Sequence, residues 1–229
     1  MADLQSKVTR RPRSKLERVL EILQPTCPVP ERPKEGIVSA VVRSYLMEAG
    51  AKDTSAIAEL DSDIKAGRVR PALLDGKLDA SQLAATMAGL NALAKLSVDG
   101  LEKLCKLDVE EAKRRLGTLP RFDAERVDWV LLASRHDASV APPAGALRVA
   151  ARLGYPGSNY AAIARALDAE IPEGDSNDVA WRAHHVLEGH AERTCHRAAP
   201  ACERCGVSAS CSYRGVDADP ARRLPVSEA

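Results

Sequence analysis

Aromatic side chains are scarce in this chain, at 3% of 229 residues, so Ala, Leu and Val must fill most of its core. Segments rich in Ala and Leu favour helix. Net charge is also nearly absent, because 33 Lys and Arg residues stand against 32 Asp and Glu residues. No global field therefore draws the protein to nucleic acid, and any such attraction must come from a local cluster of charge.

Long hydrophobic runs are missing as well. No stretch approaches the roughly 20 apolar residues that a membrane span needs, and the first 15 residues lack the apolar segment of a signal peptide. We therefore expect a cytoplasmic protein with no membrane partner, and we expect a monomer. No Gly-rich phosphate loop is present, so nucleotide binding is unsupported. The apolar fraction of 45% is enough to bury a substantial core.

The hydrophobic pattern predicts an all-α chain of about ten short helices, since β-branched runs with period-2 alternation are absent. The first helix starts near Lys15, and the Pro-rich stretch 25–33 is predicted to be a loop. Asp79 caps a helix that we expect to stop at Gly89, and Asp123 is favoured as the cap of another. Other strong helical segments cover residues 36–51, 123–134, 142–154, 159–171 and 176–195.

Four of the six cysteines fall within 17 residues near the end of the chain, with the spacing Cys195-x6-Cys202-x2-Cys205-x5-Cys211. In a reducing compartment, cysteines this close bind metal more often than they form disulfides. Zinc favours two C-x2-C pairs, and only one is present. A cubane iron–sulfur cluster accepts irregular spacing, because each of its irons takes one thiolate. We therefore predict a [4Fe-4S] cluster, with zinc as the alternative.

This cysteine spacing after a long helix resembles the C-terminal signature of the endonuclease III family of helix–hairpin–helix DNA glycosylases. The segment "AHHVLEGHAERTCHRAAPACERCGVSASCSY" (183–213) is similar to that family's last helix and cluster loop. Upstream, "GTLPRFDAERVDWVLL" (117–132) stands at the family's hairpin, and "APPAGALRVAARLG" (141–154) stands at its V-D-T-H-[VI]-x-R-[VLI] segment. The similarity extends over about residues 15–214.

The resemblance implies a two-lobed helix–hairpin–helix fold in which DNA lies across a cleft and the cluster has a structural role. Residues 36–141 would form a helical barrel domain with a degenerate hairpin. Residues 15–35 and 142–214 would form the cluster-containing domain, and residues 1–14 and 215–229 would be flexible tails, the first of them basic.

The same resemblance implies double-stranded DNA as a partner, contacted through phosphates. The hairpin glycines are replaced here, and the residues that it offers to DNA are Arg121 and Phe122. The cluster loop adds positively charged or titratable side chains, namely Arg193, His196, Arg197 and Arg204. Such contacts supply affinity without base specificity. A solvated loop around a structural cluster is the alternative interpretation.

Both catalytic positions of the family are substituted. The lysine that forms a Schiff base is replaced by Glu125, and no lysine follows Lys113 in the chain. The aspartate of the V-D-T-H segment is replaced by Pro143, and the glutamate of the related adenine glycosylases by Ala40. A carboxylate cannot form a Schiff base. Glu125 could act as a general base on water, or it could be an exposed residue that pairs with Arg121 or Arg126.

Three functional hypotheses follow. The first is an iron–sulfur protein of the DNA-repair family that binds DNA, or a protein partner, without the classical glycosylase and AP-lyase chemistry. The second is an active base-excision glycosylase that uses unconventional residues such as Glu125. The third is a redox-responsive iron–sulfur protein that interacts with another protein.

Overall fold

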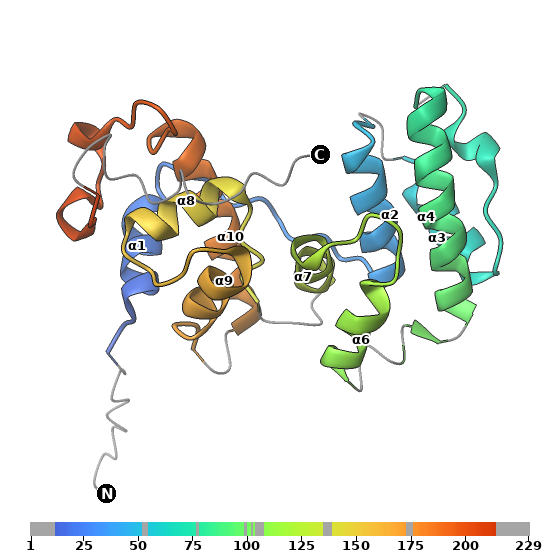
Figure 1. Ribbon diagram of the computed structural model, residues 1–229, viewed down its shortest axis with the longest axis horizontal. Helices are drawn as coiled ribbons and strands as arrows, with labels where there is room; N and C mark the ends of the chain where they lie inside the picture. The colour runs from blue at the N-terminus through green and yellow to red at the C-terminus, as the bar shows by residue number, and fades with distance from the viewer. Residues whose placement is uncertain are drawn as a thin grey trace, which may run out of the picture.

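The computed structural model describes residues 12–51, 55–76, 78–98, 100–101, 103, 108–134, 139–172 and 176–213. Every regular element within these ranges is helical (Figure 1), which confirms the all-α prediction. The predicted C-terminal tail and most of the predicted N-terminal tail lie outside the described residues.

The α-helices are α1 (Lys15–Leu23), α2 (Ile37–Glu48), α3 (Ile57–Lys65), α4 (Ala80–Val98), α6 (Val109–Leu116), α7 (Ala124–Ala133), α8 (Ala144–Arg152), α9 (Tyr160–Asp168) and α10 (Ser176–Arg193). The 3-10 turns are η1 (Pro71–Leu74), η2 (Cys202–Arg204) and η3 (Ser208–Ser210).

The helices form two groups. Figure 1 shows α1 beside α8, α9 and α10 at one end of the molecule, and α2, α3, α4 and α6 at the other. Helix α7 lies between them and contacts both α2 and α10. The N-terminal helix thus packs with the C-terminal helices. The exact boundaries expected for the two domains stay a prediction.

Two predicted helix starts are confirmed by their caps. Helix α1 begins after Ser14, whose hydroxyl accepts the N–H of Glu17, while Glu17 bonds back to the Ser14 N–H in a capping box. Helix α7 begins after Asp123, whose carboxylate accepts the N–H of Arg126 at 2.9 Å. Asp123 therefore acts as a cap, as favoured from the sequence, and its charge is stabilised at a helix N-terminus.

The predicted helix stop at Gly89 is wrong. The Asp79 cap is correct, because Asp79 Oδ1 accepts the Gln82 N–H at 2.8 Å and α4 starts at Ala80. The helix nevertheless continues to Val98. A Cβ at Gly89 would overlap the ring of Tyr45 on α2. The glycine therefore allows α2 and α4 to pack closely, and this tertiary contact outweighs its weak helix propensity.

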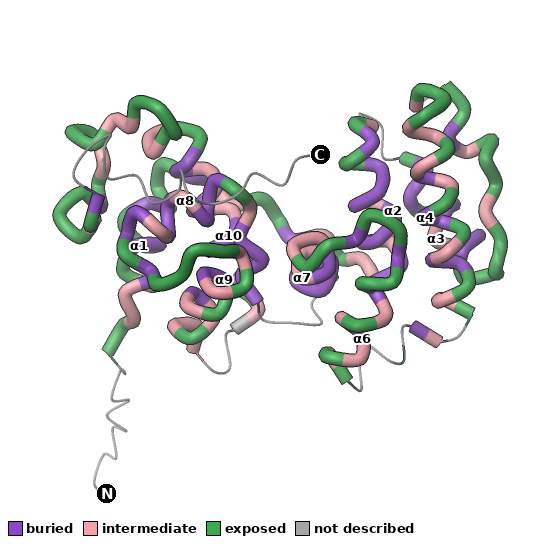
Figure 2. Tube along the Cα trace, in the orientation of Figure 1, coloured by how far each residue is buried: buried purple, intermediate pink, exposed green. Residues whose placement is uncertain are grey.

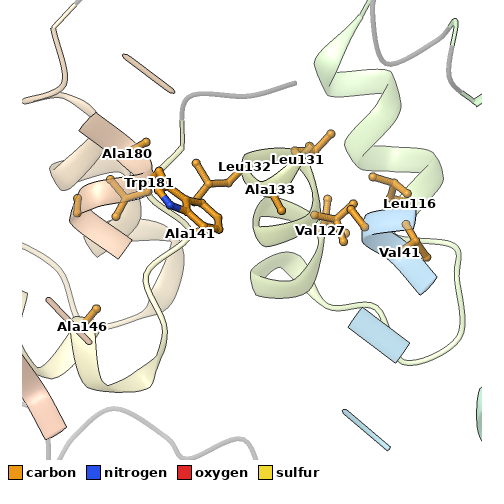
Figure 3. Close-up of a cluster of buried hydrophobic side chains, with 14 of the residues drawn as sticks. Val41, Leu116, Val127, Leu131, Leu132, Ala133, Ala141, Ala146, Ala180 and Trp181 are labelled. Atoms are coloured by element: carbon orange, nitrogen blue, oxygen red, sulfur yellow. The ribbon is translucent and has the colours of Figure 1, made fainter. Parts of the chain in front are cut away.

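Helix α7 is buried on two sides and joins the two groups of helices. Figure 3 shows Val127 near Leu116 and Val41 on one side, and Leu132 near Trp181 and Ala141 on the other. Buried residues also concentrate where the helices of each group face one another (Figure 2). A helix that is apolar on opposite faces belongs in an interior position.

Among the described residues, no helix is long and apolar enough to cross a membrane.

Candidate cofactor site and inter-lobe cavity

The four predicted ligand cysteines lie on one compact loop, residues 195–211, which we call the cysteine loop. It starts as α10 ends, where the backbone N–H of Cys195 donates to the carbonyl of His190 at 2.8 Å. Turn η2 closes with the Cys205 N–H on the Cys202 carbonyl, and turn η3 leads directly into Cys211. These local turns set the path of the chain from one cysteine to the next.

The four cysteines line a common cavity of about 190 Å³, which fits their prediction as ligands of one centre. Cys202 is exposed, and the other three side chains are partly buried. Within the described parts of the chain, no three His, Cys, Asp or Glu side chains converge on a point that could hold a single ion. The walls of the cavity are mostly apolar and include Val149, Leu153, Pro200, Ala201, Val207 and Tyr213.

Arg152, at the end of α8, ties the loop to the helices and is only 1% exposed. Its guanidinium Nη1 donates to the His196 carbonyl at 2.7 Å and to Cys195 Sγ at 3.2 Å. Nη2 donates to the Arg197 carbonyl at 3.0 Å. The carbonyl of Arg152 accepts the Tyr213 N–H at 3.2 Å, and its guanidinium lies 4.4 Å from the centre of that ring. Both ends of the loop are thus attached to one residue.

The residues predicted to contact DNA from this loop are on the surface. His196, Arg197 and Arg204 are exposed. Arg193 is also exposed, and its Nη1 donates to the carbonyl of Thr26 at 2.7 Å, which links α10 to the turn after α1. The backbone of His196 and Arg197 is held by Arg152, while their side chains remain free to face solvent.

In the hairpin before α7, by contrast, the basic side chains form ion pairs and the aromatic side chain is buried. Arg121 has φ of 61°, a left-handed conformation that favours glycine. Its side chain is 58% exposed and forms an ion pair with Glu48 of α2. Arg126 pairs with the same carboxylate and donates to the Arg121 carbonyl at 2.7 Å. Phe122 is buried, with its ring centre 5.1 Å from that of Tyr45, so it offers little surface to DNA.

A second cavity, of about 300 Å³, brings Glu125 and Pro143 together. These are the two positions at which the resemblance places the catalytic lysine and aspartate. We call this space the Glu125 cavity. Its lining comes from α2, α7, α10 and the segment before α8, and it comprises Ser44, Met47, Glu48, Glu125, Arg126, Trp129, Ala141, Pro143 and His184.

Glu125 is held in an environment that disfavours its charge. Burial raises the pKa of its carboxyl to about 7, and the nearby carboxylates of Asp123 and Glu188 add to this shift. The expectation that Glu125 is exposed and paired with arginine is wrong, because Arg121 and Arg126 pair with Glu48 instead. A carboxyl group that titrates near neutral pH can give or take a proton under ordinary conditions.

Sequence reasoning missed the polar and aromatic walls of this cavity. Trp129 packs against the hydrophobic core and also lines the cavity. His184 Nδ1 donates to the carbonyl of Ala141 at 2.7 Å, and burial lowers the pKa of the imidazole. Ala141 has φ of 46°, an uncommon conformation for a non-glycine residue. Only the apposition of α7 and α10 places these groups around one space.

No protein-family model matches the chain, and no curated protein matches it. Among solved structures, the fold is similar to that of endonuclease III trapped as a covalent intermediate with DNA, in an estranged-adenine complex. The TM-score is 0.55 and the identity 16%, over 86% of this chain and 92% of that chain. The likeness shows the fold. It confirms the helix–hairpin–helix fold that the resemblance implied.

Glu125 should give the stability of the protein a distinct pH dependence. The native carboxyl keeps its proton up to about pH 7, whereas the unfolded chain releases it near the ordinary value of 4.5. The native state therefore binds more protons in this window, and wild-type stability falls as pH rises through it. Glu125→Gln removes this loss. Between pH 4.5 and pH 7.5, the difference in free energy of unfolding between Glu125→Gln and wild type should therefore grow by about 1–2 kcal/mol in favour of the variant, after allowance for solvent screening.

Urea unfolding at a series of pH values between 4.5 and 7.5 measures this difference. Glu110→Gln, at an exposed position on α6, is the matched control and should follow the wild-type profile. Parallel profiles for wild type and Glu125→Gln would contradict the buried, protonated state of Glu125.

Proposed function

We propose that this protein is an iron–sulfur DNA-binding protein with the endonuclease III fold, and that it lacks the classical glycosylase and AP-lyase chemistry. One observation carries the proposal. Four cysteines line a single cavity beneath a loop with exposed basic side chains, on a fold similar to that of a protein solved in a covalent complex with DNA.

The cysteine loop supports a [4Fe-4S] cluster better than zinc. In a tetrahedral zinc site, four sulfurs lie about 2.3 Å from one point, and among the described residues no three His, Cys, Asp or Glu side chains converge in this way. The cysteines instead line, together with other residues, a cavity of about 190 Å³. Cys195, Cys202, Cys205 and Cys211 would be the ligands. When bound, the cluster supplies four iron–thiolate bonds that cross-link the loop. The guanidinium of Arg152 would offset part of the negative charge of the thiolates.

The DNA interface would lie on the cysteine loop and the hairpin. His196, Arg197 and Arg204 would supply phosphate contacts from the loop, Arg193 one from the end of α10 and Arg121 one from the hairpin. Because the net charge is only +1, binding depends on these local groups and should be weak and sensitive to salt. Phe122 would support the hairpin from inside, since it packs on Tyr45.

The missing lyase chemistry follows from the Glu125 cavity. An amine is needed to form a Schiff base with the sugar, and a carboxyl stands at that position. Lys113 is the last lysine of the chain. It lies on α6, where its Nζ is 3.2 Å from Asp128 Oδ1 in an ion pair, and it is not part of the cavity lining.

One observation favours a second candidate function, base excision without strand cleavage. Glu125 lines a cavity large enough for a nucleobase, and its pKa of about 7 suits a general acid or base. Trp129 also lines this cavity and provides an aromatic surface. In this candidate, Glu125 would exchange a proton with the base or with water, and no covalent enzyme–sugar intermediate would form.

Arg197→Glu should lower duplex binding at low salt by about tenfold or more, because it removes one phosphate contact and adds repulsion. Fluorescence anisotropy with a labelled duplex at several salt concentrations measures both the affinity and its salt slope. Arg165→Glu on α9 is the matched control, since Arg165 is exposed and lies outside the cysteine loop. Equal effects of the two substitutions would exclude the loop as a specific DNA contact.

Incubation with a duplex that carries one abasic site should give neither strand cleavage nor a covalent adduct on borohydride treatment. The reason is that no lysine amine is available in the Glu125 cavity. Denaturing electrophoresis detects both products, and a Glu125→Lys variant serves as a gain-of-function comparison. Cleavage with a trapped adduct in the wild type would overturn the claim that lyase chemistry is absent.

Arg152→Met should release the cluster, because the carbonyls of residues 195–197 and the Cys195 sulfur lose their common donor. Analysis of iron, acid-labile sulfide and zinc in anaerobically purified protein, together with the visible absorption, measures cluster occupancy. Arg165→Met is the control and should keep wild-type iron. A wild type that holds one zinc ion and no sulfide would overturn the cluster assignment, whatever the behaviour of the variants.

A further inference from the structure

His184 of α10 is a deeply buried polar side chain in the lining of the Glu125 cavity. It is 8% exposed, and two neighbouring rings hold its imidazole in place. The ring of Trp181 lies within 9° of parallel to it, with ring centres 6.3 Å apart, and the ring of His185 meets it edge to face at 4.7 Å. The imidazole therefore keeps one orientation at the cavity wall.

The hydrogen bonds of the His184 ring fix its tautomer. Nδ1 lies 2.7 Å from the carbonyl oxygen of Ala141 and 3.3 Å from that of Val140. A carbonyl oxygen only accepts hydrogen bonds, so Nδ1 must carry a hydrogen. Burial lowers the pKa of the imidazole. The ring is therefore neutral at neutral pH, and its second nitrogen, Nε2, keeps an unshared electron pair.

Nε2 of His184 is an acceptor that opens onto the cavity. Within the described part of the chain, every hydrogen bond of this ring is made by Nδ1. Nε2 is not sealed inside the protein, so it faces the space that His184 lines. An acceptor in a largely buried site is costly when no donor reaches it. An occupant that brings an N–H group to this nitrogen is therefore favoured.

Neighbouring carboxylates are already engaged by other parts of the protein. Glu188 reaches from α10 to the start of α8, where its Oε2 accepts the N–H of Ala146 at 2.9 Å, and it is not part of the cavity lining. Glu48 does line the cavity, but its carboxylate forms an ion pair with Arg126. His184 Nε2 differs from these groups because it has no such partner.

Another wall of the cavity comes from α7. Glu125 and Trp129 are four positions apart, so their side chains lie on one face of the helix. A protonated Glu125 presents an O–H donor next to a carbonyl acceptor. Trp129 offers a flat aromatic surface on which a base can stack. The two walls together present acceptors from both helices and one donor beside an aromatic ring.

We propose that the Glu125 cavity selects a nucleobase with an exocyclic amino group beside a ring nitrogen, as in adenine or cytosine, and that His184 Nε2 accepts a hydrogen from that amino group. An amino group carries two hydrogens, so it can donate to both His184 and Glu125 while the ring nitrogen accepts from the Glu125 carboxyl. The N–H of a uracil or thymine ring can serve only one of them. The inference rests on the second candidate function, which places a base in this cavity.

Two duplexes that differ only in one amino group test this role. One carries adenine and the other carries purine, which has the same rings without the amino group. Each stands opposite a tetrahydrofuran residue, so that no base pair opposes extrusion, and carries a 2′-fluoroarabino sugar that prevents excision. Fluorescence anisotropy should show wild type binding the adenine duplex at least about tenfold more tightly, because an unmet hydrogen bond in a buried site costs about this factor.

His184→Asn should reduce this preference to about twofold, with binding of the purine duplex unchanged. The asparagine amide can still donate to the Ala141 carbonyl but does not reach the position of Nε2. His196→Asn is the matched control, because it makes the same change at an exposed position outside the cavity. It should alter both affinities in proportion and keep the preference. The melting temperatures of both variants report their folding.

Nitrogen-15 NMR of the histidine rings gives a second readout that needs no variant to fold. Nε2 of His184 should be unprotonated in free wild type, and its resonance should shift with the adenine duplex and not with the purine duplex. Failure of wild type to bind either duplex would overturn the proposed DNA binding. Equal binding of both duplexes, an unshifted Nε2 or an undiminished preference in His184→Asn would leave DNA binding intact and overturn the role of His184.

Discussion

The buried guanidinium of Arg152 is the interaction on which the cysteine loop depends. A charge that is 1% exposed must be satisfied by hydrogen bonds, and Arg152 meets this requirement with carbonyls from the start of the loop and with the Cys195 sulfur. Its own carbonyl receives N–H groups from the end of the loop. Because α8 begins at the Glu125 cavity and ends at Arg152, its 9 residues set the separation of the two candidate sites at about 13 Å.

The hairpin is held by side chains where a glycine-rich turn would rely on its backbone. Glu48 joins Arg121 and Arg126, and the Arg126 guanidinium lies over the rings of Tyr45 and Phe122 at 5.0 and 4.4 Å. These contacts offset the strain of a left-handed arginine. They also share the charge of Arg121 with a carboxylate, which weakens its attraction for phosphate. The cysteine loop is therefore the stronger electrostatic feature of the proposed interface.

Local signals in the sequence predicted most of the helices and the cysteine loop. Caps at Asp79 and Asp123 involve bonds within three residues, so their positions follow from residue type and spacing. Gly89 misled the prediction because its role is a contact with Tyr45, 44 positions away in the chain. Arg152 gave no signal, since its partners are mainly backbone carbonyls. The environment of Glu125 and the reach of Glu188 arise from the packing of α7, α8 and α10, which no local pattern encodes.

The two positions at which the resemblance places catalytic residues are substituted in this chain, yet the cavity beside them still holds an ionisable group, Glu125. Glu125 carries an energetic cost there, because burial and two neighbouring carboxylates oppose its ionisation. An apolar residue of similar size would avoid this cost, whereas Glu188 has a structural use as the external cap of α8. Pro143, Gly145 and Glu188 form a matched set: the proline removes a local carboxylate, the glycine opens space, and the glutamate enters from the facing helix. The placement of Glu125 in a cavity where its charge is disfavoured therefore favours a chemical role for this space over a purely structural one.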